Sequence, residues 1–156
     1  MNKIALVALL LLAPAAWSYE TTKKEIDKFQ LWNNCRPMRL VIAMDDSDAA
    51  RIGLTRKDIE SAVRSRLRVA RLYDEDADNA LYIELIVTEH AFGISWRYYK
   101  EVKDKYSTYS LAPTWQRGFA GSHGEGGGSF ILSDTPKRVD FFIDEYLRVN
   151  ESGCSK

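Results

Sequence analysis

The residues best equipped for chemistry lie together in one glycine-rich stretch, GFAGSHGEGGGSF, from Gly118 to Phe130. It contains Ser122, His123 and Glu125, which offer a hydroxyl nucleophile, a base or metal ligand, and a carboxylate. Closely spaced glycines are also typical of loops whose backbone N–H groups bind a phosphate. Three kinds of site therefore have to be tested: a phosphate-binding loop, an activated serine and a metal site.

The spacing of the glycines does not fit either of the common phosphate-binding loops. A Walker loop needs a lysine after its second glycine, and Gly127 stands there when Gly121 and Gly126 supply the glycines. A dinucleotide-binding fingerprint that starts at Gly124 needs a third glycine where Ser129 stands. We therefore expect no nucleotide cofactor, and no other cofactor is indicated.

A catalytic serine or a metal also lacks the surroundings it needs. AGSHG resembles the nucleophile elbow G-x-S-x-G, with Ala120 in the first place, but glycines follow Ser122 instead of the helix that fixes such a serine. His90 is the only other histidine besides His123, and a zinc site needs three or four converging ligands. We expect no catalytic residue and no metal, and we expect residues 121–129 to form a mobile connector.

One alternative remains open, a small periplasmic hydrolase or metal-dependent enzyme that uses the loop Gly121–Ser129. Its working residues would be Ser122, His123 and Glu125. In such an enzyme the loop residues should converge with His90 on one pocket, because catalysis needs groups held in a fixed geometry. In a binding module they should not converge.

The start of the chain predicts export. MNKIALVALLLLAPAAWS combines a lysine, an apolar run and small residues, with Ala16 and Ser18 at the −3 and −1 positions for cleavage before Tyr19. The apolar run is shorter than the roughly 20 residues of a membrane-spanning helix. We therefore expect residues 1–18 to be a signal peptide, with a retained anchor as the alternative, and no membrane span after cleavage.

The two cysteines point in the same direction. Cys35 and Cys154 lie near the two ends of the expected mature chain, and neither has a histidine within ten residues. An even number of cysteines in an exported protein indicates a disulfide, and the alternative is two free thiols or a reactive cysteine. We expect a Cys35–Cys154 bond and a periplasmic or secreted protein.

The charge balance argues against polyanionic partners. The chain has 22 basic and 22 acidic residues, and the expected signal peptide accounts for only one lysine. A protein so near neutrality has no overall field to attract nucleic acid or an anionic membrane. We expect no nucleic-acid partner, and instead a contact with another exported or envelope protein.

The first half of the mature chain predicts a strand followed by a helix. Residues 19–37 are polar with spaced apolar residues, which predicts a short amphipathic helix or an arm lying on the body, and a single domain is expected over 38–154. MRLVIAM at 38–44 reads as a buried strand, and DDSDAARIG after it should break regular structure. Apolar residues at helical spacing then predict a helix at 56–72, which a capping box beginning at Thr55 would start.

The second half predicts an antiparallel meander and a closing helix. ALYIELIV, FGISWRYYKEV and a strand at 109–120 follow one another through short turns. The last helix should begin at a cap formed by Ser133 or Asp134, with Pro136 in its first turn. The order β-α-β-β-β-α gives a two-layer α+β fold, in which two amphipathic helices pack on a mixed, mostly antiparallel sheet.

This order of elements resembles one known family. A short apolar first strand, a helix such as DIESAVRSRLRVARLY, a meander and a closing helix such as VDFFIDEYLRV are similar to the N-terminal α/β module of the TolB family of the periplasmic Tol–Pal system. The similarity covers residues 38–149 and brings no functional motif, so no site residue follows from it. It implies a periplasmic, non-catalytic interaction module.

The function expected from the sequence is therefore binding. Four polar or aromatic residues of the second and third meander strands are expected to form exposed sheet contacts for a protein or glycan: Arg97, Tyr99, Gln116 and Arg117. A small exported accessory module acting through an exposed sheet face or edge is the preferred interpretation.

Overall fold

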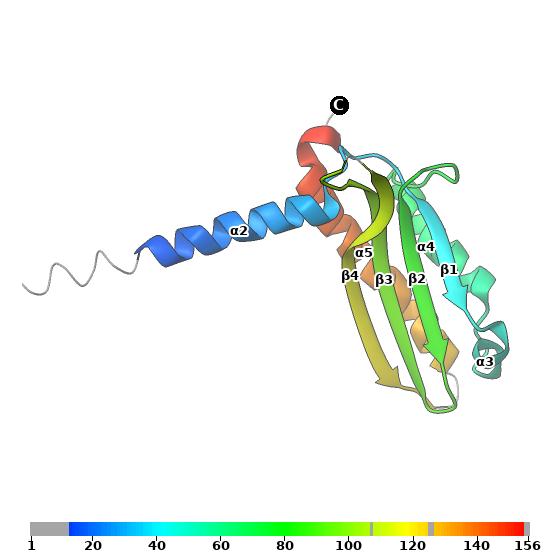
Figure 1. Ribbon diagram of the computed structural model, residues 1–156. Coiled ribbons are helices and arrows are strands. Elements are labelled where there is room, and N and C mark those ends of the chain that lie inside the picture. The colour runs from blue at the N-terminus through cyan, green and yellow to red at the C-terminus, as the bar shows by residue number, and fades with distance from the viewer. Residues whose placement is uncertain (1–12, 107, 125–126, 155–156) are drawn as a thin grey trace, which may run out of the picture.

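The computed structural model describes residues 13–106, 108–124 and 127–154, with side chains from residue 22 onward. A sheet and a layer of helices pack against each other (Figure 1). The strands are β1 (Arg39–Met44), β2 (Ala80–Val87), β3 (Ala91–Lys103) and β4 (Tyr109–Ser122). The helices are α2 (Ala13–Leu31), α3 (Asp46–Arg51), α4 (Arg56–Val69) and α5 (Gly127–Cys154).

The sheet has the predicted mixed topology. Its four strands lie in the order β1-β2-β3-β4, with β1 parallel to β2 and the other two pairs antiparallel. The α4 helix provides the crossover that a parallel pair requires. The predicted α+β fold is confirmed, although the number and bounds of the helices differ from the expectation.

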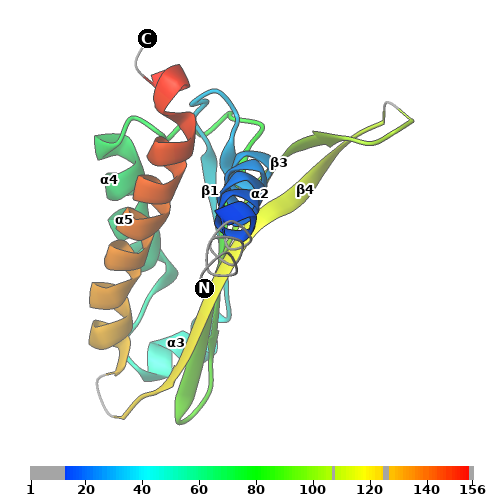
Figure 2. The ribbon, with the colours of Figure 1, turned by 90° about the vertical axis from the view of Figure 1, so that its left-hand side faces the viewer.

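The core lies between the sheet and the helix pair α4 and α5, which cover one face and leave the other without a helix (Figure 2). Ile59, Val63 and Leu67 of α4 are fully buried at the helical spacing read from the sequence. Alternate residues of β3 face these helices, including Trp96 and Tyr98. The period of two in β3 therefore separates a buried face from the helix-free face.

The segment after β1 is helical, contrary to the expectation of irregular structure. Asp45 caps the short helix α3, because its side chain accepts hydrogen bonds from the backbone N–H groups of Ser47 and Asp48. These bonds lower the pKa of Asp45, the side-chain bond from the Ser47 hydroxyl most of all. Ala49, which is fully buried, fastens the helix to the body.

The last helix begins earlier than predicted. It starts at Gly127, so Ser133 and Asp134 lie inside it rather than at its cap, and Pro136 is an interior residue. The early start depends on a close contact, because the backbone N–H of Gly128 donates to the carbonyl of Ile52 at 3.2 Å. Two glycines are poor helix formers on their own, so this tertiary contact outweighs their propensity.

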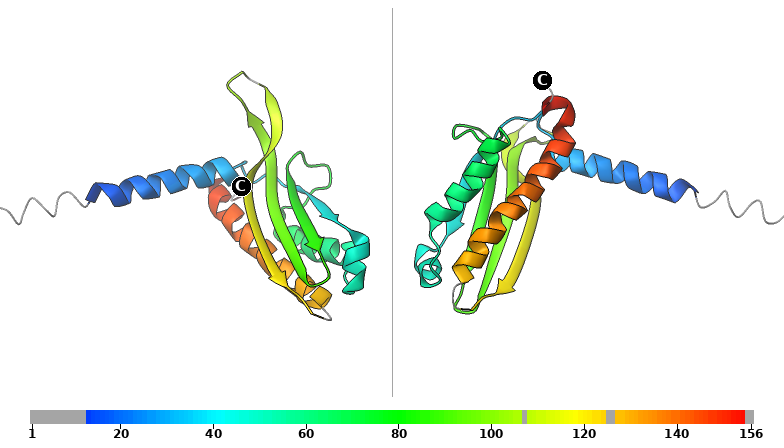
Figure 3. Two further views of the ribbon diagram at one scale, coloured as in Figure 1. Left: turned by 60° about the horizontal axis from the view of Figure 1, so that its bottom comes forward. Right: turned by 180° about the vertical axis from the view of Figure 1, so that it is seen from behind.

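The α2 helix is longer than the expected short helix and projects away from the body (Figures 1 and 3). Of the apolar residues expected to lie on the body, Ile26, Phe29 and Trp32 remain 48%, 65% and 42% exposed, while Leu31 is buried. The predicted cleavage site falls within this helix, and residues 1–12 lie outside the described part. Within that part no helix is both long enough and apolar enough to cross a membrane.

A disulfide joins the end of α5 to the loop that follows α2. Cys35 and Cys154, which are 119 positions apart in the sequence, are bonded, with Cα atoms 5.1 Å apart. The same loop is held by the buried Asn150 of α5, whose side-chain oxygen accepts from the backbone N–H groups of Asn33 and Cys35. The predicted disulfide is confirmed, and it is compatible with an oxidising, exported location.

Candidate functional site

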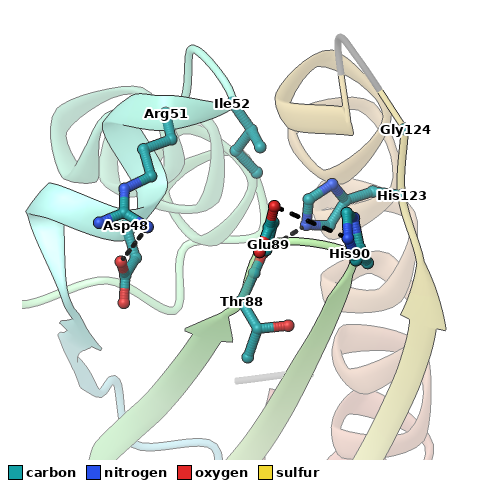
Figure 4. A pocket seen from close by; sticks show the side chains of 8 residues that line it. All are labelled: Asp48, Arg51, Ile52, Thr88, Glu89, His90, His123 and Gly124. Carbon is teal, nitrogen blue, oxygen red and sulfur yellow. Dashed lines mark hydrogen bonds and ion pairs between the residues drawn. The ribbon is translucent and has the colours of Figure 1, made fainter.

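The glycine-rich stretch contributes to an open pocket of about 390 Å³ at one end of the sheet (Figure 4). Three segments meet there: helix α3, the turn between β2 and β3, and the connection from β4 to α5. The lining residues are Asp48, Arg51, Ile52, Thr88, Glu89, His90, His123 and Gly124. His90 and His123, remote in sequence, are thus brought to one pocket, which is part of the convergence that the enzyme alternative requires.

His123 is fixed in place by the fold and not carried on a free connector. Its Nε2 lies 2.9 Å from the carbonyl oxygen of Thr88, and its backbone N–H donates to the carbonyl of His90. A Cβ atom at Gly127 would lie 2.5 Å from the Cβ of His123, so the glycine allows the close packing. The expectation of a mobile connector over 121–129 is wrong for its described residues, which belong to β4, to this anchored turn and to α5.

The ionisable groups that share the pocket with His123 are mostly solvated. His90 and Glu89 are 3.8 Å apart, with side chains 84% and 83% exposed, and Arg51 pairs with Asp48 on the opposite side of the pocket (Figure 4). Exposed pairs of this kind hold no fixed geometry. The described residues also contain no cluster of three or more metal-ligating side chains, while Glu125 lies outside the described residues.

Ser122 does not join this pocket. It is the last residue of β4 and pairs with Ala91, on the same strand face as Gln116, Gly118 and Ala120. Alternation along the strand carries its side chain to the helix-free face of the sheet. The serine and the histidine that are adjacent in sequence thus leave the backbone on different sides, and no nucleophile–base pair forms between them.

The helix-free face of the sheet brings together three of the four residues expected to make sheet contacts. Arg97 of β3 pairs with Gln116 of β4 and donates a hydrogen bond of 2.7 Å to Glu84 of β2, while the ring of Tyr99 meets Tyr82 edge to face. The neighbouring Tyr99 hydroxyl and then the Glu84 carboxylate raise the pKa of Arg97. This face is thus a polar and aromatic surface on a rigid sheet.

Arg117, the fourth of these residues, lies on the opposite face of β4. It is paired with Trp96, whose side chain faces the helices, and it forms a 3.7 Å ion pair with Glu145 of α5. Trp115 on the same side donates its indole N–H to Glu145 at 3.0 Å. Adjacent residues of a strand point to opposite faces, so Gln116 and Arg117 cannot belong to one sheet face.

The two edges of the sheet differ in how their backbone groups are covered. At the β1 edge, Arg56 donates to the carbonyl oxygens of Ile42 and Met44 at 2.6 and 2.7 Å. At the β4 edge, no described residue hydrogen-bonds to the outer backbone of the range 115–122, and the end of α2 reaches only as far as Thr114. One edge is therefore capped and the other is open.

A groove between β4 and α5 runs beside this open edge, and sequence reasoning missed it. Aromatic and basic residues line it: Trp96, Trp115, Arg117, Gly118, Lys137, Arg138 and Phe141. Phe141 is 52% exposed and lies off the buried stripe of α5 that contains Phe142 and Tyr146. The sequence signal that was overlooked is Phe141, an aromatic residue outside the amphipathic stripe and close to the basic pair Lys137 and Arg138.

No protein family model, curated protein or solved structure matches the chain.

Proposed function

We propose that this protein is a small exported, non-catalytic binding module that engages another envelope protein through the exposed part of its sheet. The observation that carries the proposal is the asymmetry of the sheet, since helices cover one face and Arg56 caps one edge. The face with Arg97, Tyr99 and Gln116 and the edge of β4 are left uncovered. Exposed rigid sheet surfaces of this kind are used for protein recognition.

Export is part of the same proposal. Residues 1–18 act as a signal peptide, and the mature protein starts at Tyr19, within the sequence that forms α2. The disulfide, which needs an oxidising compartment to persist, supports this route. N-terminal sequencing of the exported protein should start at Tyr19, and a start at Met1 would contradict cleavage. We also propose that the protein is related to the N-terminal module of the TolB family. This relation is based on the order of the strands and helices.

Site-specific photo-cross-linking in intact cells tests where the partner binds. A photoreactive residue at Tyr99 or Gln116 should form adducts with an envelope protein. The matched control position is Val69 of α4, whose side chain is 82% exposed on the helix layer that covers the other face of the sheet, and it should form none. Adducts from Val69 alone, or from none of these positions, would overturn the proposal.

One observation, that His90 and His123 line the same pocket, favours a second candidate, a metal-dependent enzyme. A metal-dependent enzyme predicts that Zn²⁺ binds the protein and that His90→Ala and His123→Ala each weaken the binding. The binding-module proposal predicts no such zinc site. Calorimetric titration with Zn²⁺ decides between the two, with Lys57→Ala as the control variant.

A further inference from the structure

We propose that the open edge of β4 takes up an extended peptide segment of its partner, and that the groove beside it selects an apolar side chain and an acidic side chain two positions apart. This inference rests on the proposed binding function and specifies the partner. Strand addition at a free edge supplies backbone hydrogen bonds, while pockets beside the strand supply the sequence preference.

The available edge sets the length of the segment. The uncovered range 115–122 extends from the bulge near Tyr99 and the contact of α2 with Thr114 to the end of β4. Eight residues of strand span about 26 Å at roughly 3.3 Å per residue. The views from both sides show α2 leaving the body away from the rest of β4, so the projecting helix does not cover this edge (Figure 3).

The groove has the composition of a binding surface for an apolar side chain. An added strand places every second side chain on the helix side of the sheet, which is where the groove lies. Trp115 forms its floor and is 4% exposed, and Phe141 forms its rim and is 52% exposed. An apolar side chain inserted between them would cover the ring of Phe141, which the fold leaves in contact with solvent.

The charges of the groove favour an acidic neighbour for that apolar residue. Arg117 is paired with Glu145 and Arg138 with Asp134, whereas Lys137 forms no ion pair with any described residue. The Lys137 side chain is exposed in this groove, and a carboxylate is the group that complements such an unpaired ammonium group.

A second copy of this chain fits the edge less well than an acidic peptide does. Joining two β4 strands into one continuous antiparallel sheet would place both α5 helices on the same side. The cations of the two grooves, including Lys137 and Arg138 of each copy, would then meet and repel one another. The occupant that complements the groove is therefore a segment of a different protein that carries a carboxylate.

The first experiment is a selection of peptides with the full-length mature protein. A displayed library of random linear nonapeptides is the probe, and we expect enrichment of sequences with an aromatic or aliphatic residue two positions from Glu or Asp. The enriched peptide should bind the Lys137→Glu variant at least about tenfold more weakly, and it should bind the Lys57→Glu variant, which changes another exposed lysine on α4, as tightly as the wild type. No enrichment, or equal binding to both variants, would overturn the proposal.

The second experiment asks whether the backbone takes part. Two versions of the enriched peptide are N-methylated at alternate residues, one version on the odd residues and the other on the even ones. Strand addition uses the N–H groups of only one edge, so one version should lose about tenfold or more in affinity while the other keeps binding. Equal losses or no loss in the two versions would mean that side chains alone make the contact.

A cross-linker at Phe141 separates failure of this inference from failure of the proposed function. Adducts from Phe141 to the same partner that Gln116 captures support uptake at the edge. Adducts from Tyr99 and Gln116 with none from Phe141 leave the binding function standing and overturn the edge-and-groove inference. If none of the three positions forms an adduct, both the proposed binding function and the edge-and-groove inference are overturned.

Discussion

The side chain of Asn150 offers the sharpest test of how the fold is closed at the disulfide. It is fully buried and makes four hydrogen bonds: two to the loop that follows α2, one to the last residue of α2 and one within α5. The side-chain oxygen accepts from the N–H groups of Asn33 and Cys35 at 2.9 and 3.1 Å, and the amide donates to the carbonyls of Leu31 and Tyr146 at 2.9 Å each. The Asn150→Ala substitution removes all four bonds.

The expected cost follows from the groups that are left without partners. The Tyr146 carbonyl lies in the helix interior, where the helix backbone already provides a donor, so it is not counted. Two loop N–H groups and the Leu31 carbonyl remain, and at about 1–1.5 kcal/mol each the free energy of unfolding should fall by about 3–4.5 kcal/mol. This is a large share of the roughly 5–15 kcal/mol that stabilises an ordinary domain.

Urea unfolding of the oxidised protein, followed by tryptophan fluorescence and by circular dichroism, measures this cost. Ser152→Ala is the matched control, because Ser152 lies two residues from Cys154 of the same disulfide but is exposed, and its change should stay under about 0.5 kcal/mol. A loss below about 1 kcal/mol for Asn150→Ala, with an unchanged denaturant slope, would refute the reasoning. In a Cys35→Ser background the loop is less constrained, so the cost of Asn150→Ala should be smaller, and strict additivity would show that the two contacts act independently.

Four further predictions follow from single contacts. Cys35→Ser should lower the free energy of unfolding by about 2–5 kcal/mol with the circular dichroism spectrum retained, and mass analysis without reductant should find no free thiol in the wild type. Gly128→Ala should cost at least about 1–3 kcal/mol, because the new Cβ would lie 2.2 Å from the Ile52 carbonyl oxygen, whereas Gly124→Ala, with nothing within 4 Å, should be nearly neutral in the same urea assay. Burial raises the pKa of Tyr98, so the folded state keeps the phenol proton at a pH at which the unfolded state has lost it. The contribution of Tyr98 to the free energy of unfolding should therefore be fully present below about pH 10 and decrease as the pH rises further, and the decrease should be shallower for Tyr98→Phe. His123→Ala should cost about 1 kcal/mol in urea unfolding because its bond to the β2–β3 turn is lost, and a change near zero would restore the idea of a free connector.

Local patterns in the sequence were sufficient for the elements that build the core. The helical spacing of Ile59, Val63 and Leu67 predicted α4 and its buried stripe, and the capping of that helix by Thr55 is present. Arg97 and Tyr99, two positions apart in β3, were expected as exposed sheet contacts, and alternation along the strand places both on the helix-free face. Such patterns succeed because burial on one side of a regular element repeats with the period of that element.

The candidate surfaces depended on relations that no local pattern contains. The sequence placed Arg117 beside Gln116, but only the strand register assigns them to opposite faces of the sheet. It offered His90 and His123 as separate residues, and the turn between β2 and β3 brings them to one pocket. Whether a sheet edge is capped depends on a distant side chain such as Arg56, which reaches β1 from the start of α4.

The glycine-rich stretch shows most clearly where sequence reasoning ended. By composition it reads as a flexible loop, and that interpretation follows correctly from the low helix propensity of glycine. In the folded protein Gly127 and Gly128 are buried at the start of α5, because only glycine permits the approach of Ile52 and His123. The sequence by itself determined that another segment can approach the backbone at Gly127 and Gly128, because glycine has no side chain to block the approach. The tertiary structure decided that this closeness builds a helix start, because the contacts that offset the low propensity come from α3 and from the end of β4, which are remote along the chain.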